Sequence, residues 1–451
     1  MKIVIVLILL VIATVVFHFV SPWYFTPIAS NWSSIDDTID LTFVITGAVF
    51  VLVNFFLAYC IYRYRHNTKI RAHYEPENKK LEIGLSVITT IGVAAMLAPG
   101  LFIWSEFVNV PKEAHFVEAV GQQWQWSFRA PGKDEVLGKV DSRFINESNP
   151  FGMDPKDQAG QDDVLVFGNE LHLPLDKPVK LLLRSKDVLH NFAVPQFRVK
   201  MDLVPGMVTH LWLTPTRTGS FEILCQELCG IAHFVMRGRV IVDSEEDYET
   251  WLTTQPTYAE TQNKVVGDPA LGQASYAVCV ACHGSQGEGN IALNAPNLNG
   301  MSDWYLARQL DYYKKGIRGT HKDDPLGQQM KAMAATLVTN KAVSDVAAYI
   351  QTLPDIVPKA TIEGDVERGH SYFVTCGTCH GAKGEGKFGV NAPRLAGQHD
   401  WYLKQQIMNF KNGVRGNHKD DLYGVQMVLM SRILPNEQAI DDVLAYINTF
   451  N

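Results

Sequence analysis

The 451-residue sequence has no basic tract and no cysteine left over for a structural disulfide. With 40 Lys and Arg against 47 Asp and Glu, the net charge of −7 argues against a nucleic-acid-binding protein. The sequence contains only 34 glycines and 21 prolines, and 47% of its residues are hydrophobic. This composition excludes collagen-like, disordered and low-complexity chains. The length is too great for one ordinary core and predicts about three domains.

Charged residues are absent from two long apolar runs near the start, residues 41–62 and 83–104. A bilayer core needs about 20 helical residues, so each run is long enough to span a membrane. A third run, residues 3–20, follows a single Lys2, and no clean small-residue cleavage site follows it. This run is either a signal peptide or an extra transmembrane helix.

Lys and Arg are also absent from the loop at 21–40, whereas the loop at 63–80 carries six of them. The positive-inside rule places the loop at 63–80 in the cytoplasm. Everything after about residue 105 is then periplasmic, and we predict a multi-pass protein of the bacterial inner membrane.

Six of the seven cysteines form three close pairs, each beside a histidine, and the seventh, Cys60, lies in an apolar run. Two pairs read Cys-Val-Ala-Cys-His at 279–283 and Cys-Gly-Thr-Cys-His at 376–380. This spacing is typical of c-type haem attachment, in which two thiols bond the porphyrin and the next His binds the iron. A redox dithiol or a zinc half-site is the alternative, which a second match in one chain disfavours. We predict two covalently bound haem c groups, on Cys279, Cys282 and His283 and on Cys376, Cys379 and His380.

The two motifs belong to an internal repeat with a constant offset of 97 residues. DWYL at 303–306 matches DWYL at 400–403, and HKDD at 321–324 matches HKDD at 418–421. Two copies are too few for a solenoid and indicate a tandem of ~90-residue helical domains, called here the first and second repeats.

The sixth iron ligand should obey the same offset, and two methionine pairs do so. A thioether ligand raises the iron potential relative to His. Resemblance to the small two-domain dihaem cytochromes c favours Met330 and Met427, with Met333 and Met430 as the alternative.

Short, apolar or alternating segments separated by turns fill residues 113–245 and predict a β-sandwich or barrel. His190 stands at a strand end, and about 35 residues later comes the segment CQELCGIAHFVM, residues 225–236. Thiolate, imidazole and thioether are the soft ligands that select copper. A single blue-copper site needs one cysteine, so the second indicates two thiolates bridging two copper ions. A Cys225–Cys229 disulfide and a zinc site are the alternatives, and Met is a poor zinc ligand.

These residues, together with DVLHNFAVPQFRVKMDLVPG and GQQWQWSF at 121–128, resemble subunit II of the haem–copper cytochrome c oxidases over roughly residues 35–250. The resemblance implies a binuclear copper centre, CuA, and a magnesium ion held by the Glu227 carboxylate at the interface with subunit I. It also implies that electrons reach CuA through Trp124 and that Glu82 lies near the mouth of a proton channel; a plain helix N-terminal acid is the alternative for Glu82. The implied copper ligands are His190, Cys225, the Glu227 carbonyl, Cys229, His233 and Met236.

The sequence departs from the family pattern in two places. Gln125 stands between two Trp residues where the family usually has an aromatic residue, and two cytochrome domains follow where most relatives have none. We therefore expect the fused domains to cover or replace the surface around Trp124.

The resemblance and the metal ligands together predict the electron-input subunit of a proton-pumping cytochrome c oxidase. Subunit I would reduce O₂, subunit III would accompany it, and a cytochrome or a quinol-oxidising complex would supply electrons. Chain order alone gives the path from the haem at Cys376 to the haem at Cys279 and then to CuA. The alternative is the CuA subunit of a nitric oxide reductase, whereas a quinol oxidase subunit II would lack the copper ligands and a sensor or storage cytochrome would not need this anchor.

The fold class expected is multidomain: a transmembrane helical hairpin, an all-β cupredoxin domain and two all-α cytochrome c domains. A polar linker over 244–264 should limit movement between the β-domain and the repeats. The predicted boundaries are 1–20 for the signal peptide or extra helix, 21–110 for the hairpin with helices at about 41–63 and 83–105, 111–250 for the cupredoxin domain, and 265–354 and 362–451 for the repeats.

Overall fold

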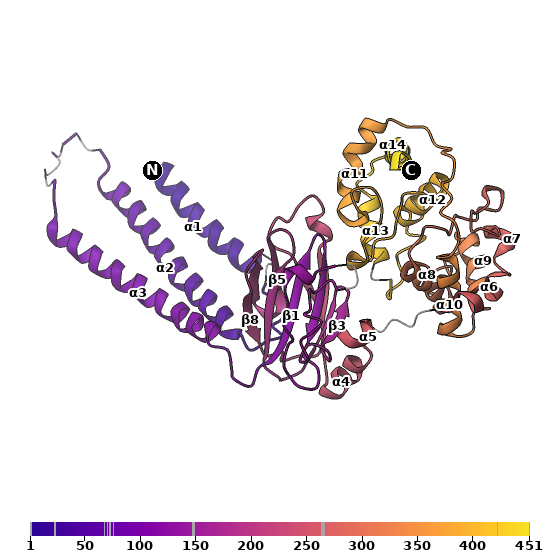
Figure 1. The fold of residues 1–451 in the computed structure, drawn as a ribbon. Coiled ribbons are helices and arrows are strands. Elements are labelled where there is room, and N and C mark those ends of the chain that lie inside the picture. Colours follow the sequence, from indigo (N-terminus) through magenta and orange to yellow (C-terminus); the bar gives the residue numbers. More distant parts are fainter. Residues whose placement is uncertain are drawn as a thin grey trace.

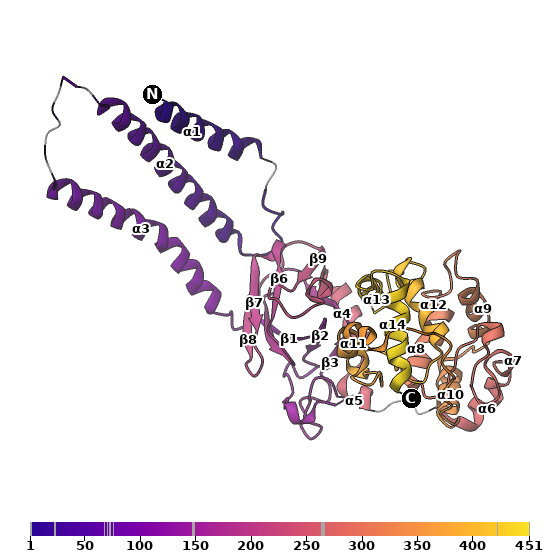
Figure 2. The ribbon, with the colours of Figure 1, turned by 90° about the horizontal axis from the view of Figure 1, so that it is seen from above.

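A computed structural model describes residues 2–21, 24–66, 68–69, 71, 74, 76–146, 149–262, 267–421 and 423–450. Three long helices lie at one end of the molecule, a two-sheet β-domain lies in the middle, and the two helical repeats lie at the other end (Figure 1). Seen from above, the helices project from the side of the β-domain away from the repeats (Figure 2). The multidomain prediction is confirmed.

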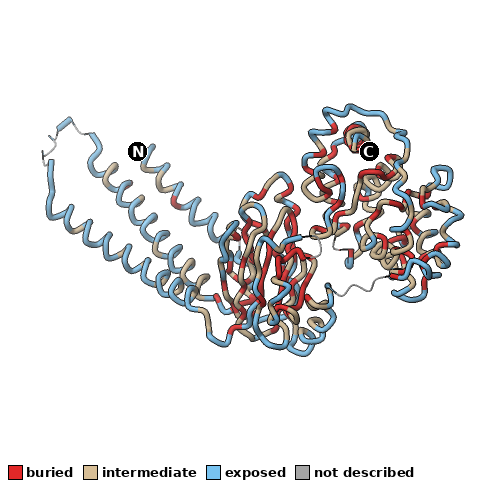
Figure 3. Tube along the Cα trace, in the orientation of Figure 1, coloured by how far each residue is buried: buried red, intermediate tan, exposed pale blue. Residues whose placement is uncertain are grey.

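The three N-terminal helices are α1 (Lys2–Val20), α2 (Ser33–Arg63) and α3 (Lys79–Val108). Each is long and apolar enough to cross a membrane. Their apolar side chains are mostly exposed along the whole length, as expected of a surface that faces lipid (Figure 3). The helices α2 and α3 are longer than the predicted spans at 41–63 and 83–105.

The added turns fasten the membrane helices to the β-domain. The Arg198 Nε donates to Asp36 in the first turn of α2 at 2.6 Å. Trp32, just before α2, is 1% exposed, and its indole N–H donates to the Trp212 carbonyl at 3.0 Å. The Trp212 indole in turn donates to the Glu106 carbonyl in α3 at 3.2 Å. The orientation of the β-domain relative to the hairpin is thereby fixed by residues from both helices.

The β-domain consists of two five-stranded sheets, ordered β3-β2-β1-β5-β8 and β4-β10-β9-β6-β7. Parallel pairing of β1 with β5 and of β4 with β10 joins segments far apart in the chain. The strands are β1 (His115–Gln122), β2 (Gln125–Ala130), β3 (Val164–Phe167), β4 (Glu170–Pro174), β5 (Val179–Ser185), β6 (His190–Val194), β7 (Val199–Leu203), β8 (Thr209–Leu213), β9 (Gly219–Leu224) and β10 (Arg237–Asp243).

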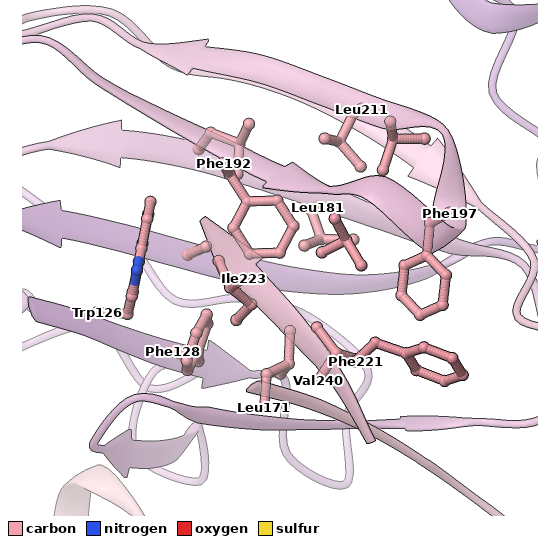
Figure 4. Close-up of a cluster of buried hydrophobic side chains, with 14 of the residues drawn as sticks. Trp126, Phe128, Leu171, Leu181, Phe192, Phe197, Leu211, Phe221, Ile223 and Val240 are labelled. Carbon is pink, nitrogen blue, oxygen red and sulfur yellow. The ribbon is translucent and has the colours of Figure 1, made fainter. Parts of the chain in front are cut away.

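Alternate residues of these strands point into a common core. In β9, Phe221 and Ile223 are buried while Glu222 between them is exposed. Trp126 packs edge-on against Phe192 with ring centroids 5.6 Å apart, which joins the two sheets (Figure 4). Burial of a large aromatic side chain contributes about 2 kcal/mol or more, so this core gives the loops at the end of the sandwich a rigid base.

The predicted linker is largely helical and packs on the β-domain. The helices α4 (Glu245–Thr253) and α5 (Tyr258–Gln262) follow β10 directly. Tyr258 is 2% exposed, and its N–H donates to the Asp163 carbonyl at 2.8 Å. Residues 263 and 264 of the predicted linker lie outside the described residues.

Each repeat closes by crossing its first and last helices. The first repeat contains α6 (Pro269–Tyr276), α7 (Val280–His283), α8 (Asp303–Lys315), α9 (Pro325–Ala334) and α10 (Asn340–Ile350). The second contains α11 (Val366–His380), α12 (Asp400–Lys411), α13 (Gly424–Ser431) and α14 (Glu437–Ile447). A Cβ at Gly272 would lie 1.9 Å from the Asp345 carbonyl, and one at Gly369 would lie 2.0 Å from the Asp442 carbonyl, so both crossings require glycine.

The repeats face each other across a pseudo-twofold interface. The Arg318 guanidinium donates to Gln309 of its own repeat and to Tyr402 and Gln406 of the other. Arg415 repeats the pattern with Gln406, Tyr305 and Gln309, each residue shifted by the same 97 positions. An interface in which each half uses the same residues is self-complementary, as in a twofold dimer.

Candidate functional site

The cysteine pair of the β-domain lies in the loop between β9 and β10. Cys225 follows directly after β9 and Cys229 ends the turn, while His190 approaches from the start of β6. His233 begins a short 3-10 helix, η3 (His233–Val235), and Met236 follows it, directly before β10. The structure brings all six predicted copper ligands together at the end of the sandwich.

The two thiols stand side by side without a disulfide. Their Sγ atoms are 3.7 Å apart, whereas a disulfide requires about 2.05 Å. The Cys225 Sγ lies 3.9 Å from His190 Nδ1 and 3.3 Å from the Glu227 carbonyl oxygen. The Cys229 Sγ lies 3.4 Å from His233 Nδ1 and 3.8 Å from Met236 Sδ. Each sulfur thus has one imidazole and one weaker ligand beside it.

This donor set fits two soft metal ions. A metal–thiolate bond is about 2.3 Å long, so two sulfurs 3.7 Å apart can both contact the same pair of ions. The pKa of the Cys225 thiol is lowered because the Cys229 thiol and the His190 ring hydrogen-bond to its thiolate, while the same pairing raises the pKa of Cys229. His190, Cys225 and Cys229 are all buried, so cations would stabilise the thiolates away from water.

Asp187 and Gln123, which the sequence analysis did not identify, hold this loop in place. The His190 Nε2 atom lies 2.8 Å from Asp187 Oδ1, which leaves Nδ1 facing the sulfurs. Burial opposes the charged form of His190, but the Asp187 carboxylate raises its pKa. Gln123 donates its backbone N–H to Asp187 and its side-chain amide to the Cys229 carbonyl, both at 2.8 Å. The sequence signal for Asp187 was its position three residues before His190, from which its carboxylate can reach the ring.

Trp124 lies directly beneath the cysteine loop. It is 4% exposed, and its indole N–H donates to the Cys229 carbonyl at 3.1 Å. Glu82 lies far from this loop, in the first turn of α3, where Asn78 caps the helix. Trp124 therefore contacts the metal loop, while Glu82 belongs to the membrane part.

The two CxxCH segments present their histidines identically. The Nδ1 atom of His283 lies 2.9 Å from the Pro296 carbonyl, and that of His380 lies 2.8 Å from the Pro393 carbonyl. A bond from Nδ1–H to a carbonyl fixes the tautomer and leaves Nε2 free as a ligand. Burial lowers the pKa of both histidines, which favours the neutral, ligating form. Burial also raises the pKa of Cys379 to about 11.

A continuous cavity in the two repeats fits a pair of large, partly anionic cofactors. It is lined by the CxxCH residues of both repeats and by all four candidate methionines, Met330, Met333, Met427 and Met430. The buried Nε atoms of Arg308 and Arg318 have no partner among the described residues. Since both arginines line the cavity, haem carboxylates would satisfy them. Arg318 and Arg415 are 97 residues apart, so the internal repeat of the sequence could have identified them as candidate functional residues.

The second repeat, not the first, contacts the β-domain. The Tyr423 hydroxyl donates to the Phe167 carbonyl at 2.6 Å, and Leu429 and Met430 pack against the β-domain core. The Cys379 Sγ approaches the Gln123 carbonyl at 3.9 Å. The spatial order is therefore β-domain, second repeat, first repeat. This spatial order differs from the order of the domains along the chain, because α13 folds back against η3 of the β-domain (Figure 1).

Gln125, the departure from the family pattern, is part of this contact. It is 4% exposed and donates its side-chain amide to the Gly389 carbonyl of the second repeat at 2.8 Å. A phenylalanine at this position would have no donor for that bond. The expectation that a fused domain covers the surface around Trp124 agrees with these contacts.

Two family models match this chain. One, described as "Cytochrome C oxidase subunit II, periplasmic domain", matches residues 115–244. The other, described as "Cytochrome c", matches residues 269–354 and again residues 366–451.

Individual relatives match the same parts. An "Alternative cytochrome c oxidase subunit 2" of Bradyrhizobium diazoefficiens is 58% identical over 259 residues, which covers 57% of this chain and 94% of the relative. The crystal structure of the periplasmic domain of subunit II of cytochrome oxidase from Bradyrhizobium japonicum is 28% identical and covers 32% of this chain and 96% of that one, with a TM-score of 0.24. Reduced cytochrome c4 from Pseudomonas stutzeri is 28% identical and covers 40% of this chain and 97% of that one, with a TM-score of 0.32.

Proposed function

The chain belongs to the cytochrome c oxidase subunit II family, with cytochrome c domains fused to its C-terminus, and from this premise we propose that it is the electron-input subunit of a proton-pumping oxidase. Electrons pass from the repeats to a binuclear copper centre in the β-domain and then to subunit I, where O₂ is reduced. The four donor groups arranged around the Cys225–Cys229 pair, which are His190, the Glu227 carbonyl, His233 and Met236, are the observation that carries this proposal.

The copper centre would supply rapid one-electron transfer, since it shares one electron between two ions. His190, Cys225, the Glu227 carbonyl, Cys229, His233 and Met236 would hold it. Asp187 orients His190, and such outer partners typically contribute 10- to 100-fold in metal affinity. The buried β-core beneath the loop limits movement of these ligands, which keeps the structural change on electron transfer small.

Each repeat would hold one haem c, through Cys279, Cys282 and His283 and through Cys376, Cys379 and His380. Met330 and Met427 are the proposed sixth ligands. Met430 also packs against the β-domain core, which supports Met427 as the residue committed to the second haem. With both axial positions filled, the haems would carry electrons without binding O₂.

The contacts of the second repeat support the path from the first repeat to the second and then to the β-domain. Helix α13 meets η3, which carries His233, and Cys379 meets the backbone beside Trp124. The second repeat thus contacts the β-domain both at η3 of the cysteine loop and at Gln123 beside Trp124.

The remaining assignments follow from the anchor and from the loop surface. We propose that the three apolar helices anchor the protein in the bacterial inner membrane, with the β-domain and the repeats in the periplasm. Leu228, Ile231 and Phe234 of the metal loop are apolar and exposed, which supports a contact there with subunit I. We propose that the Glu227 carboxylate binds magnesium at this contact and that Glu82 lies near the mouth of the proton channel. Subunit III completes the complex. A cytochrome or a quinol-oxidising complex is the electron donor.

Redox-titrated absorption and electron paramagnetic resonance of the purified complex test the proposal. We expect two low-spin c-type haems and a binuclear copper signal. Cys225→Ser should remove or convert the copper signal and leave both haem spectra intact. Cys60→Ser, in the membrane helix α2, is the matched control and should change neither.

An unchanged copper signal in Cys225→Ser would contradict the ligand assignment. Gas consumption by the same complex separates the two candidate acceptors, since the proposed oxidase consumes O₂ and a nitric oxide reductase consumes NO.

A further inference from the structure

The two repeats carry the same face in different surroundings. In the second repeat this face consists of Cys379, the short helix η5 (Phe388–Val390) and α13, and it contacts the β-domain. The equivalent face of the first repeat consists of Cys282, the short helix η4 (Ile291–Leu293) and α9, and is called here the outer face. Helices α7 and α9 lie at the end of the molecule farthest from the membrane helices (Figure 2).

We propose that the outer face is where the external electron donor docks, and that this donor is a small one-electron carrier protein with an apolar patch over its redox centre. The inference rests on the proposed function and deepens it. The second repeat shows what the face is suited to contact, because its copy lies against the metal-binding β-domain. The outer face would make the same kind of contact with a separate protein.

Exposure separates the two copies of the face. Ile291 and Leu293 are 57% and 48% exposed, whereas their equivalents Phe388 and Val390 are half-buried and 7% exposed. Phe388 is covered by Phe167 of the β-domain and by Trp304. Val278, just before Cys279, is also exposed while its equivalent Thr375 is buried. The outer face therefore presents apolar side chains, about half exposed, beside a haem-binding motif, with Ile291 lining a hollow that also includes Trp401 of the second repeat.

The chemistry of the outer face specifies the kind of partner. The segment from Gly289 to Ser302 contains no charged residue, whereas the equivalent segment of the second repeat contains Lys387 and Arg394. Because the middle of the outer face carries no charge, binding there depends on apolar complementarity more than on attraction between opposite charges on the two proteins. The matching surface on the donor is therefore an apolar patch, and the rate of electron delivery should depend only weakly on ionic strength.

Substitutions on the outer face test the proposal in the complete complex. Ile291→Glu and Leu293→Glu place a carboxylate in the patch. Leu271→Glu is the matched control, because Leu271 is as exposed as Ile291 and its equivalent in the second repeat, Arg368, pairs within its own repeat with Asp442. A purified, reduced mono-haem cytochrome c serves as the donor probe, and a phenylenediamine mediator with ascorbate serves as a reductant that needs no docking.

Two measurements are made on each complex: the second-order rate of cytochrome c oxidation, and the binding of oxidised cytochrome c by surface plasmon resonance. We expect both outer-face variants to slow cytochrome c oxidation at least tenfold and to weaken binding by a similar factor. Leu271→Glu should change neither, and mediator-driven reduction should stay unchanged in all three.

Unchanged cytochrome c oxidation and binding in Ile291→Glu and Leu293→Glu would overturn the proposal. Loss of a dimer in sedimentation of these variants would also overturn it, because the outer face would then join two copies of this chain. If mediator electrons reach the first haem but not copper in the unaltered complex, the proposed function fails instead, and the binding measurement still decides the outer face.

Discussion

The two cytochrome repeats have nearly the same internal structure and different neighbours. Both place a buried histidine against a proline carbonyl, both close with a glycine at a helix crossing, and both contribute an arginine to their shared interface. Among the described residues, however, the hydrogen bonds and core contacts with the β-domain come from the second repeat. The comparison shows that the position of a repeated domain in the fold depends on its surface and not on its order in the chain.

A few substitutions on that surface account for the difference. Tyr423 of the second repeat donates a hydrogen bond to the β-domain, and its equivalent in the first repeat is Leu326, which has no hydroxyl. Phe388 packs against Phe167, and its equivalent is the smaller Ile291. Buried hydrogen bonds and aromatic contacts each contribute on the order of 1 kcal/mol, enough to select one repeat over the other.

Removing the two proposed haems one at a time should give the largest difference between the repeats. Cys376→Ala with Cys379→Ala should leave the first haem reducible by cytochrome c but slow reduction of the copper centre ~100-fold, about 2.7 kcal/mol on the barrier. Cys279→Ala with Cys282→Ala should abolish delivery from cytochrome c while mediator electrons still reach copper. Stopped-flow absorption follows each centre. Equal behaviour of the two double variants would contradict the proposed order.

The pseudo-twofold interface predicts that equivalent substitutions in the two repeats have equal effects on stability. Arg318→Gln and Arg415→Gln each remove two hydrogen bonds across the interface, from a charged donor. We expect each to lower the free energy of unfolding of the paired repeats by about 2 kcal/mol. Thermal unfolding followed at the haem absorption band measures it. A large effect from only one of the two would show that the interface is not symmetric in energy.

The smallest effect is expected at the contact that distinguishes the second repeat. Gln125→Ala removes one buried hydrogen bond, to the Gly389 carbonyl, at a cost of about 1 kcal/mol. Amide exchange in residues 388–391 should become roughly fivefold faster. In the control Gln351→Ala, which removes a similar bond to the Met301 carbonyl within the first repeat, exchange at 388–391 should not change. Equal exchange in both variants would mean that Gln125 does not hold the second repeat in place.

Much of the fold and the local ligand sets could be predicted because they depend on short-range pattern. Long uncharged runs predicted the apolar helices, and the spacing of Cys225, Cys229, His233 and Met236 placed four candidate ligands on one loop. Features that depend on distant residues were missed. The first turns of α2 are helical beyond the apolar run because Asp36 pairs with Arg198. The linker is helical because Tyr258 and its neighbours pack on the β-domain.

The neighbour of the β-domain could not be predicted for a similar reason. Both repeats carry the same motifs, and the residues that differ, such as Leu326 and Tyr423, have no obvious meaning until Phe167 is seen opposite one of them. Gln125 was noticed as unusual, but only the structure supplies its partner in the second repeat.

The fold-back of the second repeat onto the β-domain limits how this chain can be shortened. A stop codon after the first repeat would delete the second repeat, which contacts the cysteine loop of the β-domain. The first repeat would then remain attached to the chain but would lose the second repeat, which it contacts. A working single-haem version would instead require an internal excision, joining α5 directly to the segment before α11.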